Sequence, residues 1–275
     1  MKHNNRGFAH LVLLLVILGL VVGSVGYYVV NKSKTNTSPS DSRQSSQAAG
    51  DASSDSNQAS GSNKPGCTAG AAGIFTKDVT DMSKVSLIQN PIRLVGGSNI
   101  KTHSYIEVSE RSPVYAPMDA TLTGGANYYE TGGEMPVTKV QYLLSFNDGC
   151  DLVIWLDHLV DVPDTIKNAF PPEPRNDTQG VQVNKVAVKA GELVGYTNQT
   201  ARARFDFGVF NLAGPETSLT TNPKYKDDPI VQTSNKYRYA TCPYNFYDEA
   251  TMQKYQALYD GTVSGDQAII DDICD

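Results

Sequence analysis

Residues 203–210 read Ala-Arg-Phe-Asp-Phe-Gly-Val-Phe, and apolar side chains alternate along this stretch with polar or small ones. Alternation with a period of two is typical of a β-strand, because successive side chains point to opposite faces of a sheet. The stretch therefore predicts a strand on which Arg204 and Asp206 share one face. We expect these two residues to form surface or half-buried polar pairs along that strand.

Working outward, the rest of residues 67–275 repeats the pattern of short apolar runs separated by Gly- and Pro-containing turns. Short strands at this spacing indicate an all-β sandwich or barrel. Residues 248–259 are the best helix candidate, and residues 161–180, rich in Pro and Asp, predict a long exposed loop. The strand candidates are residues 113–117, 120–123, 137–145, 152–156, 186–188 and 193–196.

The N-terminal third differs in composition from this β-rich region. Residues 1–7 contain Lys2 and Arg6, and residues 8–30 contain no acid, Lys or Arg. An apolar run of this length is sufficient to cross a bilayer, so we expect a transmembrane anchor with residues 1–7 in the cytoplasm. A cleaved signal peptide is the alternative. Residues 31–66, rich in Ser, Asn and Asp, predict a disordered linker.

All four cysteines lie after this linker, at positions 67, 150, 242 and 274. An even number beyond a membrane anchor indicates an oxidising, extracytoplasmic compartment and two disulfides, with free buried thiols as the alternative. Three pairings are possible. We expect Cys242–Cys274 with Cys67–Cys150, because the first bond would tie the C-terminal segment back on itself.

The chain is acidic, with a formal net charge of −6. It has no basic stripe with interleaved aromatic residues, so nucleic acid is excluded as an expected partner. Tight adhesion of the domain itself to anionic lipid is excluded on the same ground. Contact with the membrane is expected only through residues 8–30.

Four motifs occur in a set order that is similar to the LytM/lysostaphin-like M23 zinc endopeptidases. They are residues 112–122, residues 155–159 ending in His158-Leu159, the hairpin at 188–195, and residues 203–209. The resemblance implies a barrel-sandwich hybrid core with a duplicated hybrid motif. It is closer still to secreted M23-like proteins with an LDFGV-type motif, which Cys150, residues 205–210 and Cys242-Pro243 match.

The residues that the resemblance places at the zinc site are mostly substituted. His103 and Glu107 keep the spacing of the first two ligands, with Glu in place of Asp, and Asp206 replaces the third, a His. Tyr105 stands where the family has Gly. Imidazole and carboxylate both bind zinc, so this set could hold an ion, but the expected state is a site without a cofactor.

The two further histidines that the family uses in catalysis correspond to His158 and Arg204. Arg204 keeps its proton at neutral pH and cannot act as a general base, although it could hold an oxyanion or a carboxylate. We expect His158 to be a residual catalytic residue held by a neighbour such as Asp157. Tyr105, Tyr128 and Tyr129 are candidates for stacking on glycan rings, the last two in a segment that looks like a loop.

These observations favour a catalytically inactive M23-like domain, anchored in the cell membrane by one span, that binds cell-wall glycopeptide or another envelope protein. An active peptidoglycan endopeptidase with a His/Glu/Asp metal site is the first alternative, and Arg204 argues against it. A structural surface protein without a ligand is the second.

Overall fold

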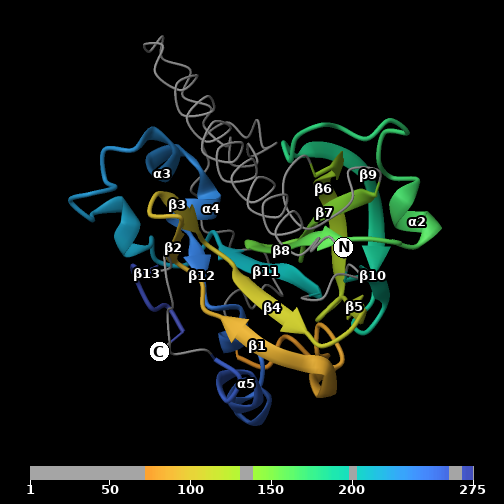
Figure 1. Ribbon diagram of the computed structural model, residues 1–275, viewed down its shortest axis with the longest axis horizontal. Helices are drawn as coiled ribbons and strands as arrows, with labels where there is room; N and C mark the ends of the chain where they lie inside the picture. The colour runs from red at the N-terminus through yellow and green to blue at the C-terminus, as the bar shows by residue number, and fades with distance from the viewer. Residues whose placement is uncertain (1–71, 131–138, 198–202, 260–267, 275) are drawn as a thin grey trace, which may run out of the picture. The chain divides into compact units, whose positions relative to one another are not determined.

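The computed structural model describes residues 72–130, 139–197, 203–259 and 268–274. Eight strands form the main sheet, in the order β1-β4-β11-β8-β7-β6-β9, with β12 paired to β11 (Figure 1). All its pairings are antiparallel. The strands are β1 Val85–Gln89, β4 Ser104–Val108, β6 Ala120–Tyr129, β7 Val140–Asn147, β8 Leu152–Leu159, β9 Val181–Val188, β11 Ala203–Asn211 and β12 Ala240–Thr241.

Two smaller sheets complete the β structure. β10 Leu193–Tyr196 pairs with β5 Pro113–Tyr115, and β2 Arg93–Val95 lies between β3 Asn99–Lys101 and β13 Ala268–Ile269. The prediction of a mainly β protein is therefore confirmed. Within the described residues no sheet closes into a barrel, so the barrel-sandwich hybrid stays a prediction.

Helices are few and short in the described ranges. They are α2 Asp164–Lys167, α3 Pro229–Thr233, α4 Asn235–Arg238 and α5 Glu249–Gln256, with 3₁₀ turns η1 Met82–Lys84, η2 Ser218–Thr220 and η3 Pro243–Phe246. α5 confirms the predicted helix, and Asp248 caps its start by accepting a hydrogen bond from the Thr251 N–H at 2.9 Å. α2 lies inside the segment predicted to be a loop.

The main sheet carries apolar side chains on both faces. Phe205, Phe207 and Val209 of β11 belong to the larger core, whereas Phe210 joins a second core with Trp155 of β8. Residues from β2, β3, α3 and α4 complete this second core, and Figure 1 shows these elements grouped beside one another. The predicted half-exposed strand is therefore buried on both faces, and Asp206 is buried with it.

The disulfide Cys242–Cys274 is present, which confirms one predicted pair. It ties the C-terminal segment to η3. Cys67, the partner expected for Cys150, lies outside the described residues, as do the predicted anchor at 8–30 and linker at 31–66. In the part of the chain that the structure describes, no helix has the length and apolar character that crossing a membrane requires.

Candidate functional site

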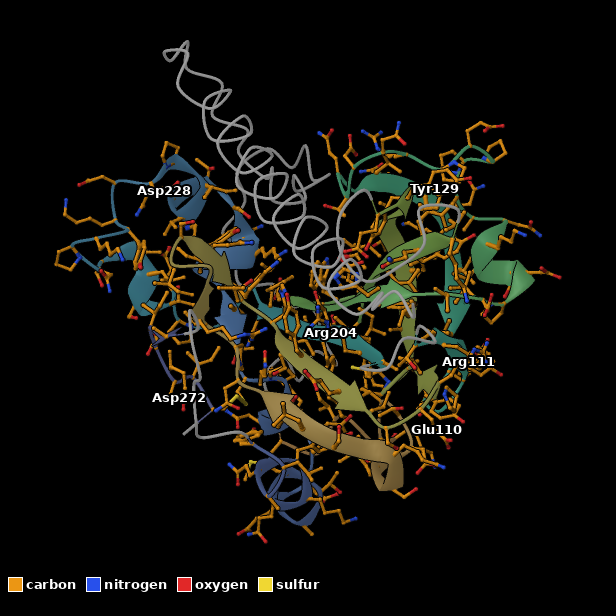
Figure 2. The ribbon with its side chains drawn as sticks, viewed as in Figure 1. Glu110, Arg111, Tyr129, Arg204, Asp228 and Asp272 are labelled. Carbon is orange, nitrogen blue, oxygen red and sulfur yellow. A yellow bond between two sulfur atoms is a disulfide. The ribbon has the colours of Figure 1, made fainter. Side chains whose placement is uncertain are left out.

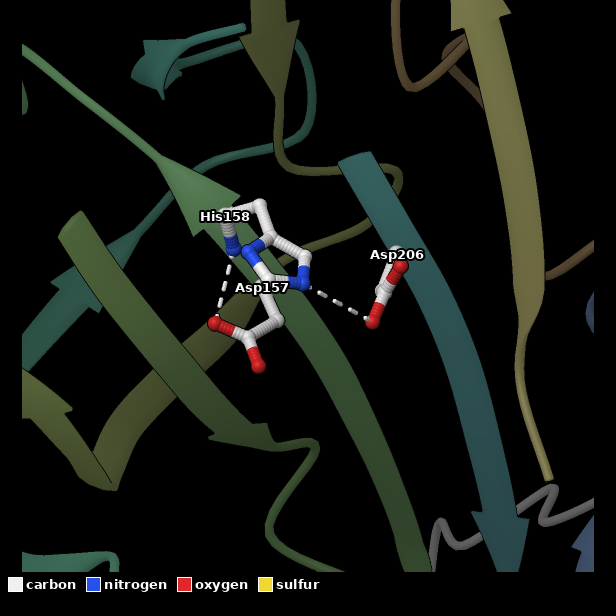
Figure 3. Close-up of side chains that lie close together, drawn as sticks. All are labelled: Asp157, His158 and Asp206. Carbon is white, nitrogen blue, oxygen red and sulfur yellow. Dashed lines mark hydrogen bonds and ion pairs between the residues drawn. The ribbon is translucent and has the colours of Figure 1, made fainter. Parts of the chain in front are cut away.

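Three potential metal ligands meet where β8 and β11 run side by side. Asp206 of β11 is in direct register with Asp157 of β8, and His158 follows Asp157 in the chain. One ligand atom from each of the three lies within 4.8 Å of the others. Figure 3 shows the His158 ring between the two carboxylates, with its Nε2 facing Asp206.

An irregularity in β8 brings two consecutive side chains to this place. His158 has a left-handed backbone, with a φ of 63°. The pairing of β7 with β8 shifts register between Tyr142 and Leu144, so two residues of β8 lie opposite one of β7. Such a bulge redirects side chains, and bulges are common beside functional sites. A non-glycine residue with positive φ costs free energy that surrounding contacts must offset.

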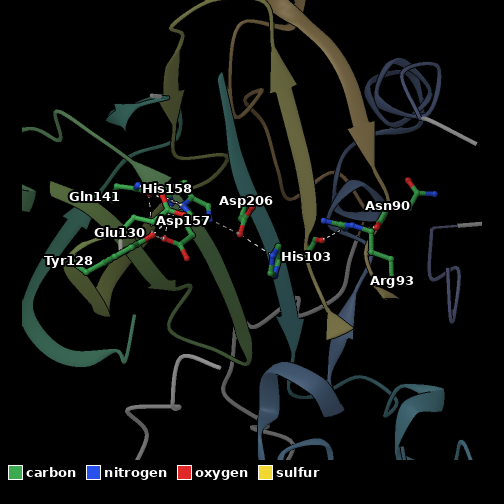
Figure 4. A network of polar contacts seen from close by, with 9 residues as sticks. All are labelled: Asn90, Arg93, His103, Tyr128, Glu130, Gln141, Asp157, His158 and Asp206. Carbon is green, nitrogen blue, oxygen red and sulfur yellow. Dashed lines mark hydrogen bonds and ion pairs between the residues drawn. The ribbon is translucent and has the colours of Figure 1, made fainter. Parts of the chain in front are cut away.

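Contacts from β6 and β7 hold the bulge. The His158 N–H donates to Asp157 Oδ1 at 2.7 Å, as does the Tyr128 hydroxyl, also at 2.7 Å. His158 Nδ1 lies 2.7 Å from Gln141 Oε1 (Figure 4). Asp157 thus accepts from the backbone amide of His158, whereas Gln141 and Tyr128 contact its ring, and the role of His158 as a residual catalytic residue stays a prediction.

The Tyr128 side chain therefore makes an internal hydrogen bond and is not exposed to solvent. It lies in β6, not in a loop, and its side chain is 1% exposed. The expectation that its ring is available to stack on a sugar is wrong, because β6 continues to Tyr129 and the second core covers this face. Tyr129 is half-buried in the same strand, and its predicted role in binding stays a prediction.

His103 approaches Asp206 from the other side. Its Nε2 lies 2.9 Å from Asp206 Oδ2, and both side chains are buried. The absence of a side chain at Gly208 makes room for it, since a Cβ there would lie 3.0 Å from the Cβ of His103. The Trp155 ring packs against the His103 ring, with 4.5 Å between their centroids. The packing around His103 thus explains a Gly at position 208.

The electric charges of the site follow from burial and from the closeness of its carboxylates. Burial lowers the pKa of His103 to about 3. The nearby Asp206 acts in the opposite direction but offsets only part of the effect of burial. Burial also lowers the pKa of His158, but Asp157, Asp206 and Glu130 outweigh it, and the pKa lies above the ordinary value. At neutral pH His103 is therefore neutral, whereas the carboxylates around His158 favour its protonated form more than water does.

The two aspartates respond differently to the same surroundings. Burial raises the pKa of Asp157 above its ordinary value, and the charge of Asp206 adds to this effect. Burial acts in the same direction on Asp206, but the neighbouring imidazoles outweigh it and leave its pKa below the ordinary value. Asp206 is accordingly the more strongly ionised of the pair.

Glu107 and Arg204 lie in register with each other on β4 and β11, next to the pair Tyr105 and Asp206. Glu107 does not belong to the group of close ligand atoms found among the described residues. The structure thus brings His103 and Asp206 together but leaves out the Glu107 side chain. The donor set implied by the family does not fit as a unit, whereas the Asp157, His158 and Asp206 side chains come together on β8 and β11.

Tyr105, at the position of the family's Gly, is held between cationic groups. Its ring centroid lies 4.1 Å from the Arg93 guanidinium carbon and 5.4 Å from that of Arg204. Arg93 also donates from Nη1 to the carbonyl oxygens of Asn90 and His103, at 2.7 and 2.8 Å. Arg204 is half-buried and extends from the start of β11 (Figure 2).

Several residues of this network were not found from the sequence. Glu130, Gln141 and Arg93 lie far from the four motifs and have no spacing that marks them. Gln141 joins the site because β7 pairs with the bulged strand β8, and Arg93 joins it through β2. Only the pairing of strands reveals these contributions.

Comparison with known proteins adds little to this site. No family model matches the chain, and no curated protein matches it. The solved structure of Helicobacter pylori Csd3 in an orthorhombic crystal is similar, with 12% sequence identity and a TM-score of 0.27. The match covers 54% of this chain and 34% of that one, so this chain spans about a third of its neighbour's length. A TM-score this low carries no argument about function, and the M23 likeness remains a resemblance of motifs.

Proposed function

We propose that the chain is a membrane-anchored, extracytoplasmic M23-like protein that binds cell-wall glycopeptide, or another envelope protein carrying carboxylates, without hydrolysing it. The observation that carries this proposal is the identity of the residues at the positions where the family transfers protons. Arg204 stands where the family has a catalytic His, and it retains its proton at neutral pH. Of the two positions that the resemblance assigns to proton transfer in catalysis, only the one at His158 keeps a His.

The half-buried Arg204 supports a binding role. A guanidinium donates to a carboxylate through two parallel hydrogen bonds, which gives both affinity and geometric selectivity. Tyr105 lies beside it and is half-buried. Peptide stems of cell-wall glycopeptide end in carboxylates, so an Arg next to an aromatic ring suits that class of ligand.

The test is co-sedimentation of the purified full-length protein with insoluble peptidoglycan, together with an assay for released soluble fragments. We expect binding without release, and weaker binding by Arg204→Ala. Arg175→Ala is the matched control, because Arg175 is half-buried like Arg204 and pairs with Asp177 at 2.7 Å. Release of soluble fragments by the wild type would show that the protein is a hydrolase. Equal binding by wild type and Arg204→Ala would show that Arg204 is not part of the binding site.

A further inference from the structure

Two buried carboxylates face each other across β8 and β11. Asp157 is 4% and Asp206 2% exposed, and they occupy directly opposite positions of the antiparallel pair. Like charges at opposite positions repel, and burying them away from water adds to the cost. Glu130 adds a third carboxylate, 4.0 Å from His158 Nδ1. Two imidazoles lie among these three carboxylates, and His103 is neutral because burial lowers its pKa to about 3, so carboxylates outnumber the groups that can carry positive charge.

The His158 ring is oriented so that one nitrogen is available as a ligand. Gln141 donates from Nε2 to Glu130 Oε2 at 2.5 Å, and a carboxylate can only accept, so the Gln141 oxygen must face His158. His158 Nδ1 therefore carries a hydrogen and donates to that oxygen. In the neutral ring this leaves the lone pair on Nε2, which points at Asp206. Metal-binding histidines are commonly oriented in this way, by a hydrogen bond from the nitrogen that does not bind the ion.

The spacing between His158 and Asp206 suits an ion. His158 Nε2 and Asp206 Oδ2 are 3.7 Å apart, too far for a direct hydrogen bond. Two atoms that each lie about 2.1 Å from one Zn²⁺ are at most about 4.2 Å apart, and about 3.4 Å apart in a tetrahedral arrangement. The observed distance falls between these limits.

A further observation points the same way. Asp206 Oδ1 is buried and has no hydrogen-bond partner among the described residues. Buried carboxylate oxygens are normally satisfied, so an unpartnered one requires an explanation such as an ion. The other oxygen, Oδ2, is the one that lies 3.7 Å from His158 Nε2, and it also lies 2.9 Å from His103 Nε2.

We propose that Asp157, His158 and Asp206 bind one divalent transition-metal ion of the Zn²⁺ type. One imidazole nitrogen and two carboxylate oxygens favour such an ion over Ca²⁺ or Mg²⁺, which take oxygen ligands. The ligands come from β8 and β11. The set implied by the family instead includes Glu107 of β4 and His103, the residue just before β4. The ion offsets the charge of the two aspartates, and its remaining positions accept oxygen from water or from a ligand carboxylate.

The experiment is calorimetric titration of Zn²⁺ into the purified full-length protein after removal of metal with a chelator. Trp155 emission is a second readout, because this only Trp of the chain packs next to the site. We expect one ion per chain and no comparable binding of Ca²⁺. Asp157→Asn, Asp206→Asn and His158→Gln should each weaken binding at least tenfold. Gln141→Met, which removes the orienting hydrogen bond, should weaken it about 10–100-fold.

Glu107→Gln is the matched control, because it removes a carboxylate from the same face of the sheet without touching the proposed ligands. Its affinity for Zn²⁺ should equal that of the wild type. Absence of Zn²⁺ binding by the wild type would overturn the proposal whatever the variants do. A loss in Glu107→Gln as large as in Asp157→Asn would overturn it in favour of the family's set. Melting temperatures of the metal-free variants identify any that fail to fold. The readout is metal affinity, so its failure is distinguishable from failure of the proposed wall-binding function.

Discussion

Gly208 offers a test of how tightly the site is packed. A methyl group at this position would place a carbon 3.0 Å from His103 Cβ, 3.5 Å from Trp155 Cε3 and 3.7 Å from His103 Cα. Carbon atoms prefer separations of about 3.5–4.0 Å, so the closest approach is short by roughly 0.5–1 Å. β11 is paired to β4 on one side and β8 on the other, so neither neighbour can withdraw easily.

Overpacking of this kind typically costs about 1–3 kcal/mol. For a domain of this size each kcal/mol lowers the melting temperature by about 2–4 °C, so Gly208→Ala should melt roughly 2–12 °C below the wild type. The sign of the change is decisive. Where space exists, replacing Gly by Ala inside a strand reduces the entropy of the unfolded chain and raises stability by about 0.4–1 kcal/mol.

The assay is thermal unfolding of the full-length protein followed by circular dichroism. Ala187→Ser is the control, since it adds one heavy atom on the exposed side of the edge strand β9 and should leave the melting temperature nearly unchanged. An equal or higher melting temperature for Gly208→Ala would refute the argument that Gly208 makes room for His103.

Three further outcomes are expected. Tyr128→Phe removes one of the two donors to Asp157 Oδ1 and should destabilise the fold by about 1–3 kcal/mol in denaturant titration, whereas Tyr129→Phe should not. Equal effects of the two substitutions would contradict a structural role for the Tyr128 hydroxyl. Replacing Cys242 and Cys274 together by Ala removes a disulfide that spans 32 residues and should lower the free energy of unfolding by about 2–4 kcal/mol. An unchanged denaturation midpoint would count against a stabilising disulfide. Burial raises the pKa of Tyr247 and Tyr255, so folding favours their protonated forms, and stability should fall as the pH rises above the ordinary phenol pKa near 10. The ultraviolet absorbance of phenolate should then appear together with unfolding. Its appearance for all tyrosines in the folded protein at pH 10 would contradict this expectation.

Much of the local structure could be predicted because it depends on neighbours in the chain. Alternation in residues 203–210 and the apolar run at 152–156 predicted β11 and β8, and Asp248 marked the start of α5. The Cys242–Cys274 pair followed from the location of the cysteines. The covering of β11 on both faces could not be predicted in this way, since the second core comes from β2, β3, α3 and α4, which are distant in sequence.

By itself, the sequence determined a mainly β protein, because alternation is a property of short segments. The order of its motifs made His103, His158 and Asp206 candidate site residues. The tertiary structure decided which of these positions meet. A bulge at His158 and the register of β8 with β11 bring Asp157 into the cluster, while the position of Glu107 opposite Arg204 leaves it out. Register is the physical reason, since the residue that lies opposite another across a sheet is set by the pairing of whole strands and not by either strand alone.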